Sequence, residues 1–159
     1  MLHVESEKTV FEVPVQTIVN TVNCDGFMGK GLALEIKRRF PPVFAKYQKL
    51  CRKGQMRVGK LQLIKGPGQW VLNFPTKNHW RGRSRISFVE AGLKNFKATY
   101  KRRGITSIAF PPLGCGSGGL QWGEVKPLMY CYLEKLHDIE VFVCLGSPQQ
   151  TIPNDSVRG

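Results

Sequence analysis

Hydrophobic positions recur along the chain with two different periods, which predicts strands interleaved with helices. Residues 16–20 form a short apolar run that is typical of a buried strand. Residues 84–103 carry apolar side chains three or four positions apart, with Lys and Arg on the opposite face, as in an amphipathic helix. The same patterns predict strands at 60–65, 70–74, 106–110 and 140–145, and helices at 32–40, 43–52 and 122–136. This alternation favours an α/β fold in which helices cover both faces of a sheet.

Proline, glycine and serine mark the expected helix ends. Pro41 and Pro42 are expected to end the helix before them, because proline cannot continue it. Ser84 is expected to cap the long helix, since its hydroxyl can accept a hydrogen bond from a free backbone N–H group. Gly54 and Gly104 are expected to close the helices that precede them.

The unusual residue clusters of the chain lie in three loops, each of which follows a predicted strand. These loops begin after Asn20, Phe74 and Phe110. In open α/β sheets, ligands bind beyond the carboxyl ends of the strands. We therefore expect the three loops to meet and to form the binding site.

Two of these loops, at 20–31 and 111–120, are rich in glycine and precede helices. Glycines let the backbone approach a ligand closely, and a helix start offers N–H groups to an anion. Asn23 could hydrogen-bond a ribose hydroxyl, and Lys30 could contact a phosphate, although Gly31 breaks the P-loop pattern. The two loops together predict one diphosphate held from two sides; alternatively, each is only a flexible loop with a helix cap. A Rossmann site is disfavoured because the G-x-G-x-x-G pattern with its later acid is missing.

The remaining loop, at 73–81, contains candidate reactive groups. Lys77 stands just beyond an apolar strand, where partial burial among other cations would lower its pKa. It could act as a nucleophile or a proton carrier, or simply as a phosphate clamp. His79 could be a general base or a surface hydrogen-bonding group. Trp80 could stack on a base or pack within the loop.

Charge points to a polyanionic partner. The 159 residues carry 24 Lys and Arg against 11 Asp and Glu, a net charge of +13. The segments 37–60 and 77–103 each contain nine of these cations, and their only acid is Glu90. Such clustering favours nucleic acid or a phosphate-rich ligand, although a charge run is more often a solvated helix face.

Composition limits the remaining classes. The length suits a single domain with its own core, which we place at 1–146, followed by a tail or linker at 147–159. Five cysteines without a C-x-x-C pair argue against a disulfide framework and a zinc site, and no metal or cofactor is expected. No apolar run is long enough for a membrane span, and the N-terminus does not look like a signal peptide. We therefore expect a cytoplasmic protein without a membrane partner, and a monomer.

The sequence resembles a macrodomain, the ADP-ribose-binding α/β/α fold, from about residue 16 to residue 145. The resemblance implies a three-layer α/β/α domain with a central mixed sheet. The block at 73–81, NFPTKNHWR, is similar to the DNA ADP-ribosyl glycohydrolase (DarG) antitoxins, whose partner toxins attach ADP-ribose to thymidine in single-stranded DNA. The other stretches that carry the resemblance are VNTVN at 19–23, MGKGLA at 28–33, and PPLGCG with GGL and Trp122 in the region 111–122.

The resemblance also implies roles for individual residues. Lys77 would be the catalytic lysine, and Asn23 would bind the distal ribose beside the bond to be cleaved. The residues expected to bind ADP-ribose are Thr9, Asn20, Asn23, Gly29, Lys30, Gly31, Thr76, Leu113, Gly114, Cys115, Gly116, Ser117, Gly118 and Gly119. The expected DNA contacts are His79, Trp80, Arg81 and Arg83.

Three places in the sequence bear on how far the resemblance holds. Two depart from the pattern of the family, and one differs between its subgroups. Thr9 stands where macrodomains carry an Asp that binds the adenine amino group. Gly118 stands where relatives that act on protein carry an Asp that assists the lysine. The group that acts on DNA also has glycine at this position. The stretch Asp25-Gly26-Phe27 replaces the small apolar residues common in this loop, and Asp25 could be an extra acid or base or merely a turn residue.

These features predict hydrolysis of the bond between ADP-ribose C1″ and thymidine in DNA. Lys77 could attack C1″ as a neutral amine, or donate a proton or hydrogen bond to the leaving base. The alternatives are a hydrolase of ADP-ribose on acidic protein side chains, a non-catalytic ADP-ribose-binding module, and a nucleic-acid-binding module without ADP-ribose. The expected partners are ADP-ribosylated single-stranded DNA and a cognate ADP-ribosyltransferase toxin.

Overall fold

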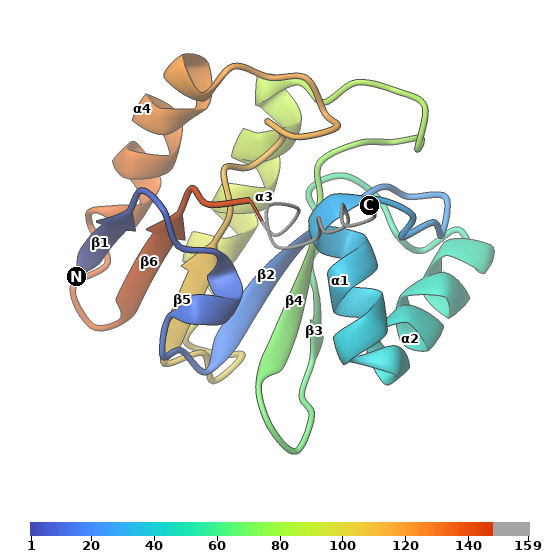
Figure 1. Ribbon diagram of the computed structural model, residues 1–159, viewed down its shortest axis with the longest axis horizontal. Coiled ribbons are helices and arrows are strands. Elements are labelled where there is room, and N and C mark those ends of the chain that lie inside the picture. The colour runs from blue at the N-terminus through green and yellow to red at the C-terminus, as the bar shows by residue number, and fades with distance from the viewer. Residues whose placement is uncertain (148–159) are drawn as a thin grey trace, which may run out of the picture.

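The computed structural model describes residues 1–147 and contains one six-stranded sheet in the order β1-β6-β5-β2-β4-β3 (Figure 1). All neighbouring strands pair in parallel except β3 and β4, which makes the sheet mixed. The strands are β1 Leu2–Glu5, β2 Thr17–Val22, β3 Gln62–Ile64, β4 Trp70–Pro75, β5 Ser107–Phe110 and β6 Glu140–Cys144. The helices are the 3₁₀ helix η1 Val10–Glu12, α1 Gly31–Arg39, α2 Pro41–Arg52, α3 Ile86–Thr99 and α4 Trp122–Leu133.

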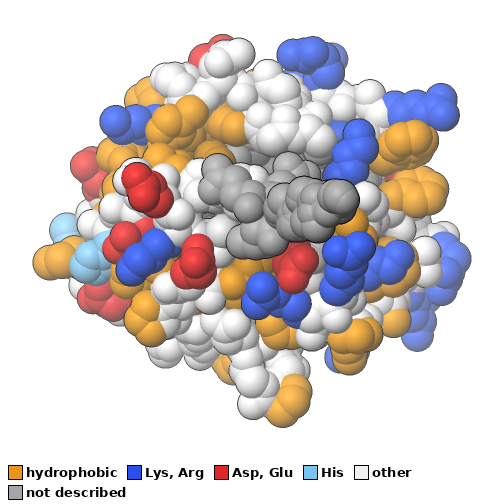
Figure 2. Space-filling view, in the orientation of Figure 1, with side chains coloured by type: hydrophobic (Ala, Val, Ile, Leu, Met, Phe, Trp, Pro, Cys, Tyr) orange, Lys and Arg blue, Asp and Glu red, His pale blue; other side chains and the backbone are white. Residues whose placement is uncertain are grey.

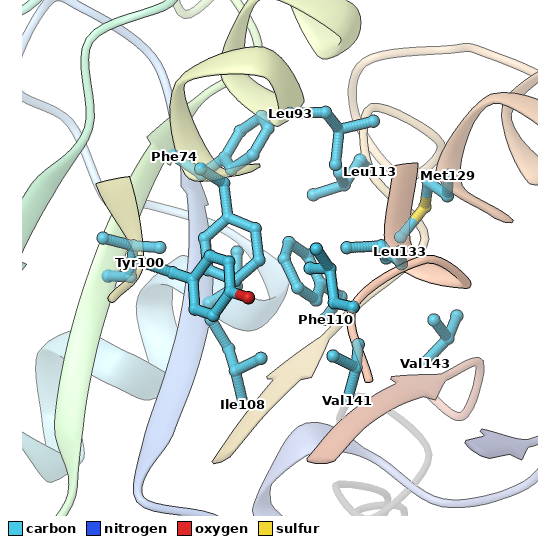
Figure 3. Packing of buried hydrophobic residues seen from close by; sticks show 14 of the residues in the cluster. Phe74, Leu93, Tyr100, Ile108, Phe110, Leu113, Met129, Leu133, Val141 and Val143 are labelled. Atoms are coloured by element: carbon cyan, nitrogen blue, oxygen red, sulfur yellow. The ribbon is translucent and has the colours of Figure 1, made fainter. Parts of the chain in front are cut away.

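The sheet separates two hydrophobic cores, so the fold has three layers. Side chains alternate across each central strand: Ile18 of β2 belongs to the core under α1 and α2, and its neighbour Val19 to the core under α3 and α4. Figure 3 shows the second core, in which Phe74 and Phe110 meet edge to face with ring centroids 6.4 Å apart. The predicted α/β/α fold class is confirmed.

Close packing of α3 on the sheet depends on a glycine in that helix. A Cβ at Gly92 would lie 2.3 Å from the Phe74 ring. The absence of a side chain therefore lets α3 approach β4, the strand from which the loop with Lys77 starts. Within residues 1–147, no helix has the length and apolar character that crossing a membrane requires.

Two helix ends differ from the sequence predictions. Pro41 and Pro42 follow α1, and they also form the first turn of α2, where proline lacks only an N–H group that would be unpaired anyway. Ser84 is not the N-cap of α3: Arg85 takes that position without a side-chain hydrogen bond. Instead, the Ser84 N–H group donates to the carbonyl of Gly118, so Ser84 supports the glycine-rich loop.

One strand was missed by the sequence patterns. β1 has only four residues, and it pairs in parallel with β6 at the edge of the sheet. All the strands and helices that were predicted are present, with boundaries shifted by a few residues. The predicted tail at 147–159 lies outside the described residues except for Ser147.

Candidate functional site

A cleft of about 1010 Å³ lies at the carboxyl ends of the central strands. β5, β2 and β4 are neighbours in the sheet and run parallel, so the loops that follow them emerge side by side. The predicted meeting of the three loops is therefore confirmed. The predicted residues that line the cleft are Asn23, Gly29, Lys30, Gly31, Thr76, Lys77, Trp80, Arg81, Gly114, Gly116, Ser117 and Gly118.

A fourth segment of the cleft was not found from the sequence. Cys144, the last residue of β6, and residues 145–147 after it line the cleft together with Val10 of η1. β6 lies next to β5, so the loop after it also reaches this edge of the sheet. The rule that found the other three loops applies to this one, but its residues have no unusual composition that would have singled them out.

Lys77 is the one charged side chain that is buried in the described part of the chain, with 7% of its surface exposed. It stands two residues beyond the end of β4, and its Nζ donates a hydrogen bond to the carbonyl of Trp80 at 2.8 Å. Burial, and then the nearby positive charge of Lys30, lower the pKa of Lys77 from its usual 10.5. A larger fraction of this amine is therefore neutral near physiological pH than in an exposed lysine.

The cleft is suited to an anion. Lys30, Lys77 and Arg81 line it, and no Asp or Glu does so among the described residues. The cleft residues of the first loop continue through Gly31 into the first turn of α1, where Lys30 is the N-cap without a side-chain hydrogen bond. The backbone N–H groups of this turn and the helix dipole add to the positive potential.

The glycine-rich loop after β5 is folded tightly by its own backbone. Leu120 N–H donates to the carbonyl of Gly114, and Gly114 adopts a φ of +74°, which favours glycine. A Cβ at Gly118 would lie 2.2 Å from Ser84 Oγ and 2.5 Å from the Gly114 carbonyl oxygen. The loop in this conformation therefore has no room for a side chain at position 118.

Three of the predicted ADP-ribose-binding residues of this loop do not line the cleft. Leu113 is fully buried in the core, and Gly119 accepts a long hydrogen bond of 3.5 Å from Arg83. Cys115 is half-buried, and burial, with a smaller effect of Glu124, raises the pKa of its thiol to about 11. This thiol is therefore protonated and unreactive at neutral pH.

Asn23 organises the first loop from within. Its Oδ1 accepts hydrogen bonds from the backbone N–H groups of Asp25, Gly26 and Phe27 at 3.0, 3.2 and 3.4 Å. Its Nδ2 donates to the Phe27 carbonyl, and the buried hydroxyl of Tyr47 lies 2.8 Å from Oδ1. The second hydrogen on Nδ2 can donate a hydrogen bond to a ligand.

Asp25 joins the first loop to the loop after β4. Its Oδ2 accepts a hydrogen bond from Trp80 N–H at 2.9 Å, and its Oδ1 lies 3.3 Å from His79 Nδ1. The backbone strengthens the same junction, because Cys24 N–H donates to the carbonyl of Asn78. Asp25 does not line the cleft, so its contacts within the described chain are those of a loop clamp.

Two other predicted ligand-binding residues also lie outside the cleft lining. Asn20 is fully buried in the sheet, and its Nδ2 donates to Asn73 Oδ1 on the paired position of β4. Thr9 caps η1: its Oγ1 accepts from Phe11 N–H, and its own N–H donates to Glu12. Thr9 thus precedes Val10, the residue of this segment that does line the cleft.

The mouth of the cleft carries two exposed aromatic rings. Phe27 and Trp80 meet edge to face with centroids 5.8 Å apart, and the Arg81 guanidinium lies over the Trp80 ring. His79 and Arg83 are near in sequence but do not line the cleft. Phe27 was not predicted as a site residue, although the stretch Asp25-Gly26-Phe27 departs from the family pattern and gave a signal for it.

The surface charge is uneven. Lys and Arg side chains gather on the side of α1 and α2, and acidic side chains gather on the side of β1 and β6 (Figure 2). This separation follows from the basic segment 37–60, which contains the last three residues of α1 and all of α2. The positive side of the molecule is thus next to the loop that bears Lys30.

Comparison with known proteins places the site in context. The sequence model of the Macro domain family matches residues 19–129. A DNA ADP-ribosyl glycohydrolase of Thermus aquaticus is 46% identical over 138 residues, which cover 84% of this chain and 38% of that protein. A DNA ADP-ribosyl transferase-DNA ADP-ribosyl glycohydrolase fusion protein of Thermosipho africanus is 40% identical over 149 residues, which cover 82% of this chain and 38% of that protein. The chain thus spans about two fifths of the length of these curated relatives.

Solved structures agree with the sequence matches. The macrodomain of Mycobacterium tuberculosis DarG superposes with a TM-score of 0.87 at 36% identity, covering 92% of this chain and 99% of that one. A structure of Thermosipho africanus DarTG in complex with ADP-ribose superposes with a TM-score of 0.77 at 40% identity, covering 89% of this chain and 40% of that one.

Proposed function

Because the chain belongs to the macro domain family, we propose that its cleft binds ADP-ribose and that the protein removes ADP-ribose from modified DNA. The observation that carries this proposal is the buried amine of Lys77 in a cleft that, in the described chain, has no acid in its lining. A module that only binds ADP-ribose has no need for a buried lysine with a lowered pKa.

ADP-ribose has a charged diphosphate in the middle, with adenosine at one end and the distal ribose at the other. We propose that each part lies in a different region of the cleft. The diphosphate would lie between the first turn of α1 and the glycine-rich loop at 114–118, where backbone N–H groups and Lys30 can neutralise it. The distal ribose would lie beside Asn23 and Lys77. The adenine would lie toward Val10 and Leu145, which line the cleft near the end of β6.

The reaction is the hydrolysis of a glycosidic bond. The bond between C1″ and the base breaks, the base keeps the electron pair and gains a proton, and C1″ gains the hydroxyl group of water. Lys77 can contribute in either of two ways: its neutral form attacks C1″ and is later released by water, or its protonated form donates a proton to the leaving base. The lowered pKa assists both routes, because it makes the free amine more abundant and the ammonium a stronger acid.

DNA is favoured as the carrier of ADP-ribose by three observations. The net charge is +13, and two exposed rings and Arg81 lie at the mouth of the cleft. The close contact of Gly118 with Ser84 leaves no space for the Asp that assists the lysine in the group that acts on protein. The names of the Thermus aquaticus and Thermosipho africanus relatives agree with this choice.

The partners follow from the same proposal. The substrate would be single-stranded DNA that carries ADP-ribose on thymidine. A cognate ADP-ribosyltransferase would supply it, as the fused arrangement of the Thermosipho africanus relative suggests. Such a protein would act as a monomer in the cytoplasm, where its substrate is made.

A direct assay with two substrates tests the proposal. A single-stranded oligonucleotide with one ADP-ribosylated thymidine is compared with a peptide that carries ADP-ribose on glutamate. We expect release of ADP-ribose from the oligonucleotide and much slower release from the peptide. Faster release from the peptide would favour the protein-directed alternative, and tight binding of ADP-ribose without release from either substrate would leave a binding module.

A further inference from the structure

We propose that Phe27 and Trp80 form a stacking site for the nucleobase that carries ADP-ribose, an inference that rests on the proposed function. Four large hydrophobic side chains are exposed in the described residues, and two of them, Met1 and Val4, lie at the edge strand β1. The other two are Phe27, with 53% of its surface exposed, and Trp80, with 44%. Both line the cleft, and they are in contact with each other. Exposed apolar rings gathered at a cleft are typical of a binding surface.

The geometry of the two rings suits a planar base. The rings meet at an interplanar angle of 63°, so they form a corner rather than a closed stack. The Arg81 guanidinium carbon lies 4.7 Å from the Trp80 centroid and supplies a positive charge beside the site. A base can stack on one ring and touch the edge of the other, because every nucleobase has a flat π face.

Hydrogen bonds fix the backbone from which both rings project. The peptide N–H of Trp80 donates to Asp25, and its carbonyl accepts from Lys77 Nζ. The carbonyl of Phe27 accepts from Asn23 Nδ2. The stacking surface and the reactive amine therefore share one residue, Trp80. A base that stacks there is placed beside the amine, which is where the bond between the base and C1″ must lie.

The adenine of ADP-ribose does not compete for these rings. The aromatic pair belongs to the loops after β2 and β4, whereas Leu145 and the rest of the adenine end follow β6. Three strand spacings separate β6 from β4 in the sheet order, a distance of roughly 14 Å. The glycine-rich loop after β5 lies between the two ends, so the nucleotide spans the cleft with its distal ribose toward the aromatic pair.

The test compares two ligands in matched variants. Phe27→Ala and Trp80→Ala each remove a ring, and Phe27→Tyr and Trp80→Phe retain an aromatic ring. Val4→Ala removes an exposed apolar side chain that does not line the cleft. Calorimetry measures the affinity for free ADP-ribose, which also shows that each variant is folded. Steady-state kinetics measure KM and kcat for the ADP-ribosylated oligonucleotide.

We expect each alanine variant to raise KM for the oligonucleotide by about 10-fold and to bind free ADP-ribose as the wild type does. The aromatic variants and Val4→Ala should keep a KM near that of the wild type. An unchanged KM in both alanine variants would overturn the stacking site, and an equal loss of affinity for free ADP-ribose would mean that the rings hold adenine instead. If the wild type releases no ADP-ribose, the proposed function fails, and the binding constants for the modified oligonucleotide then decide the stacking site by itself.

Discussion

The carboxylate of Asp25 accepts a hydrogen bond from the backbone N–H of Trp80 at 2.9 Å, and the carbonyl of the same tryptophan accepts one from Lys77. Asp25 lies outside the cleft lining and thus acts through the loop rather than on a ligand. It is a positioning residue: it fixes the backbone of Trp80, whose carbonyl holds the reactive amine.

Removal of the Asp25 carboxylate should slow turnover without weakening the binding of ADP-ribose. Asp25→Ala loses the acceptor for Trp80 N–H, so we expect kcat to fall by about 10- to 100-fold as Lys77 loses its position. Asp25→Asn keeps one acceptor oxygen and should lose less. The comparison requires kcat, KM and the ADP-ribose affinity of each variant.

Asp138→Ala is the matched control, because it removes a carboxylate that bonds Tyr100 and Lys101 away from the cleft. Its kcat should equal that of the wild type. A wild-type kcat in Asp25→Ala would show that the loop does not need this clamp.

The pH dependence of kcat/KM should depend on Lys30. The charge of Lys30 contributes to the lowered pKa of Lys77, so Lys30→Met should raise that pKa toward 10.5. The inflection that Lys77 produces in a plot of log kcat/KM should lie below pH 10.5 in the wild type and move upward in the variant. A rate that rises through the inflection indicates attack by the neutral amine, and a rate that falls indicates proton donation.

Lys97→Met serves as the control for this shift, because Lys97 lies on the exposed face of α3. Its profile should coincide with that of the wild type. The same inflection in Lys30→Met and the wild type would contradict the coupling between the two lysines.

Several parts of this molecule could be predicted from the sequence because they depend on local patterns. The stripe from Ile86 to Tyr100 predicts α3, and the three loops were found because a parallel sheet brings the carboxyl ends of neighbouring strands together. Lys77 was identified by its place just after an apolar strand. The inferences about α3 and Lys77 need only residues near one another in the chain, and the inference about the loops needs only the general rule for parallel strands.

Other parts depend on contacts between distant segments, which a pattern along the chain does not contain. Asp25 and Trp80 are far apart in sequence, and nothing in either loop indicates that they pair. Ser84 was expected to cap α3, but its N–H group instead donates a hydrogen bond to the carbonyl of Gly118. β1 is too short to show a period, and its position is fixed only by pairing with β6.

Gly118→Ala should destabilise the glycine-rich loop. The new Cβ would meet Ser84 Oγ at 2.2 Å and the Gly114 carbonyl oxygen at 2.5 Å, and the second contact is with backbone that cannot rotate away. We expect the free energy of unfolding to fall by about 1–3 kcal/mol, together with weaker binding of ADP-ribose. Urea denaturation and calorimetry measure the two effects.

Gly116→Ala provides the stability control in the same loop, because a Cβ there meets nothing within 4 Å. It should unfold at nearly the same urea concentration as the wild type. Equal stability of both alanine variants would mean that the loop readily moves away from Ser84.

Asn20→Ala should act on stability rather than on ligand binding. Asn20 is fully buried, and its loss would leave Asn73 Oδ1 without the hydrogen bond that it accepts across the strands. We expect a loss of about 1–3 kcal/mol in the free energy of unfolding and an unchanged affinity for free ADP-ribose. A large loss of affinity at full stability would instead place Asn20 among the ligand contacts.

The central claim is that the amine of Lys77 performs the release of ADP-ribose, and single-turnover release from an ADP-ribosylated oligonucleotide by Lys77→Ala tests it most directly. We predict a rate at least about 100-fold below that of the wild type, with free ADP-ribose still bound and with Lys97→Ala fully active. Release by Lys77→Ala at the wild-type rate would contradict the account.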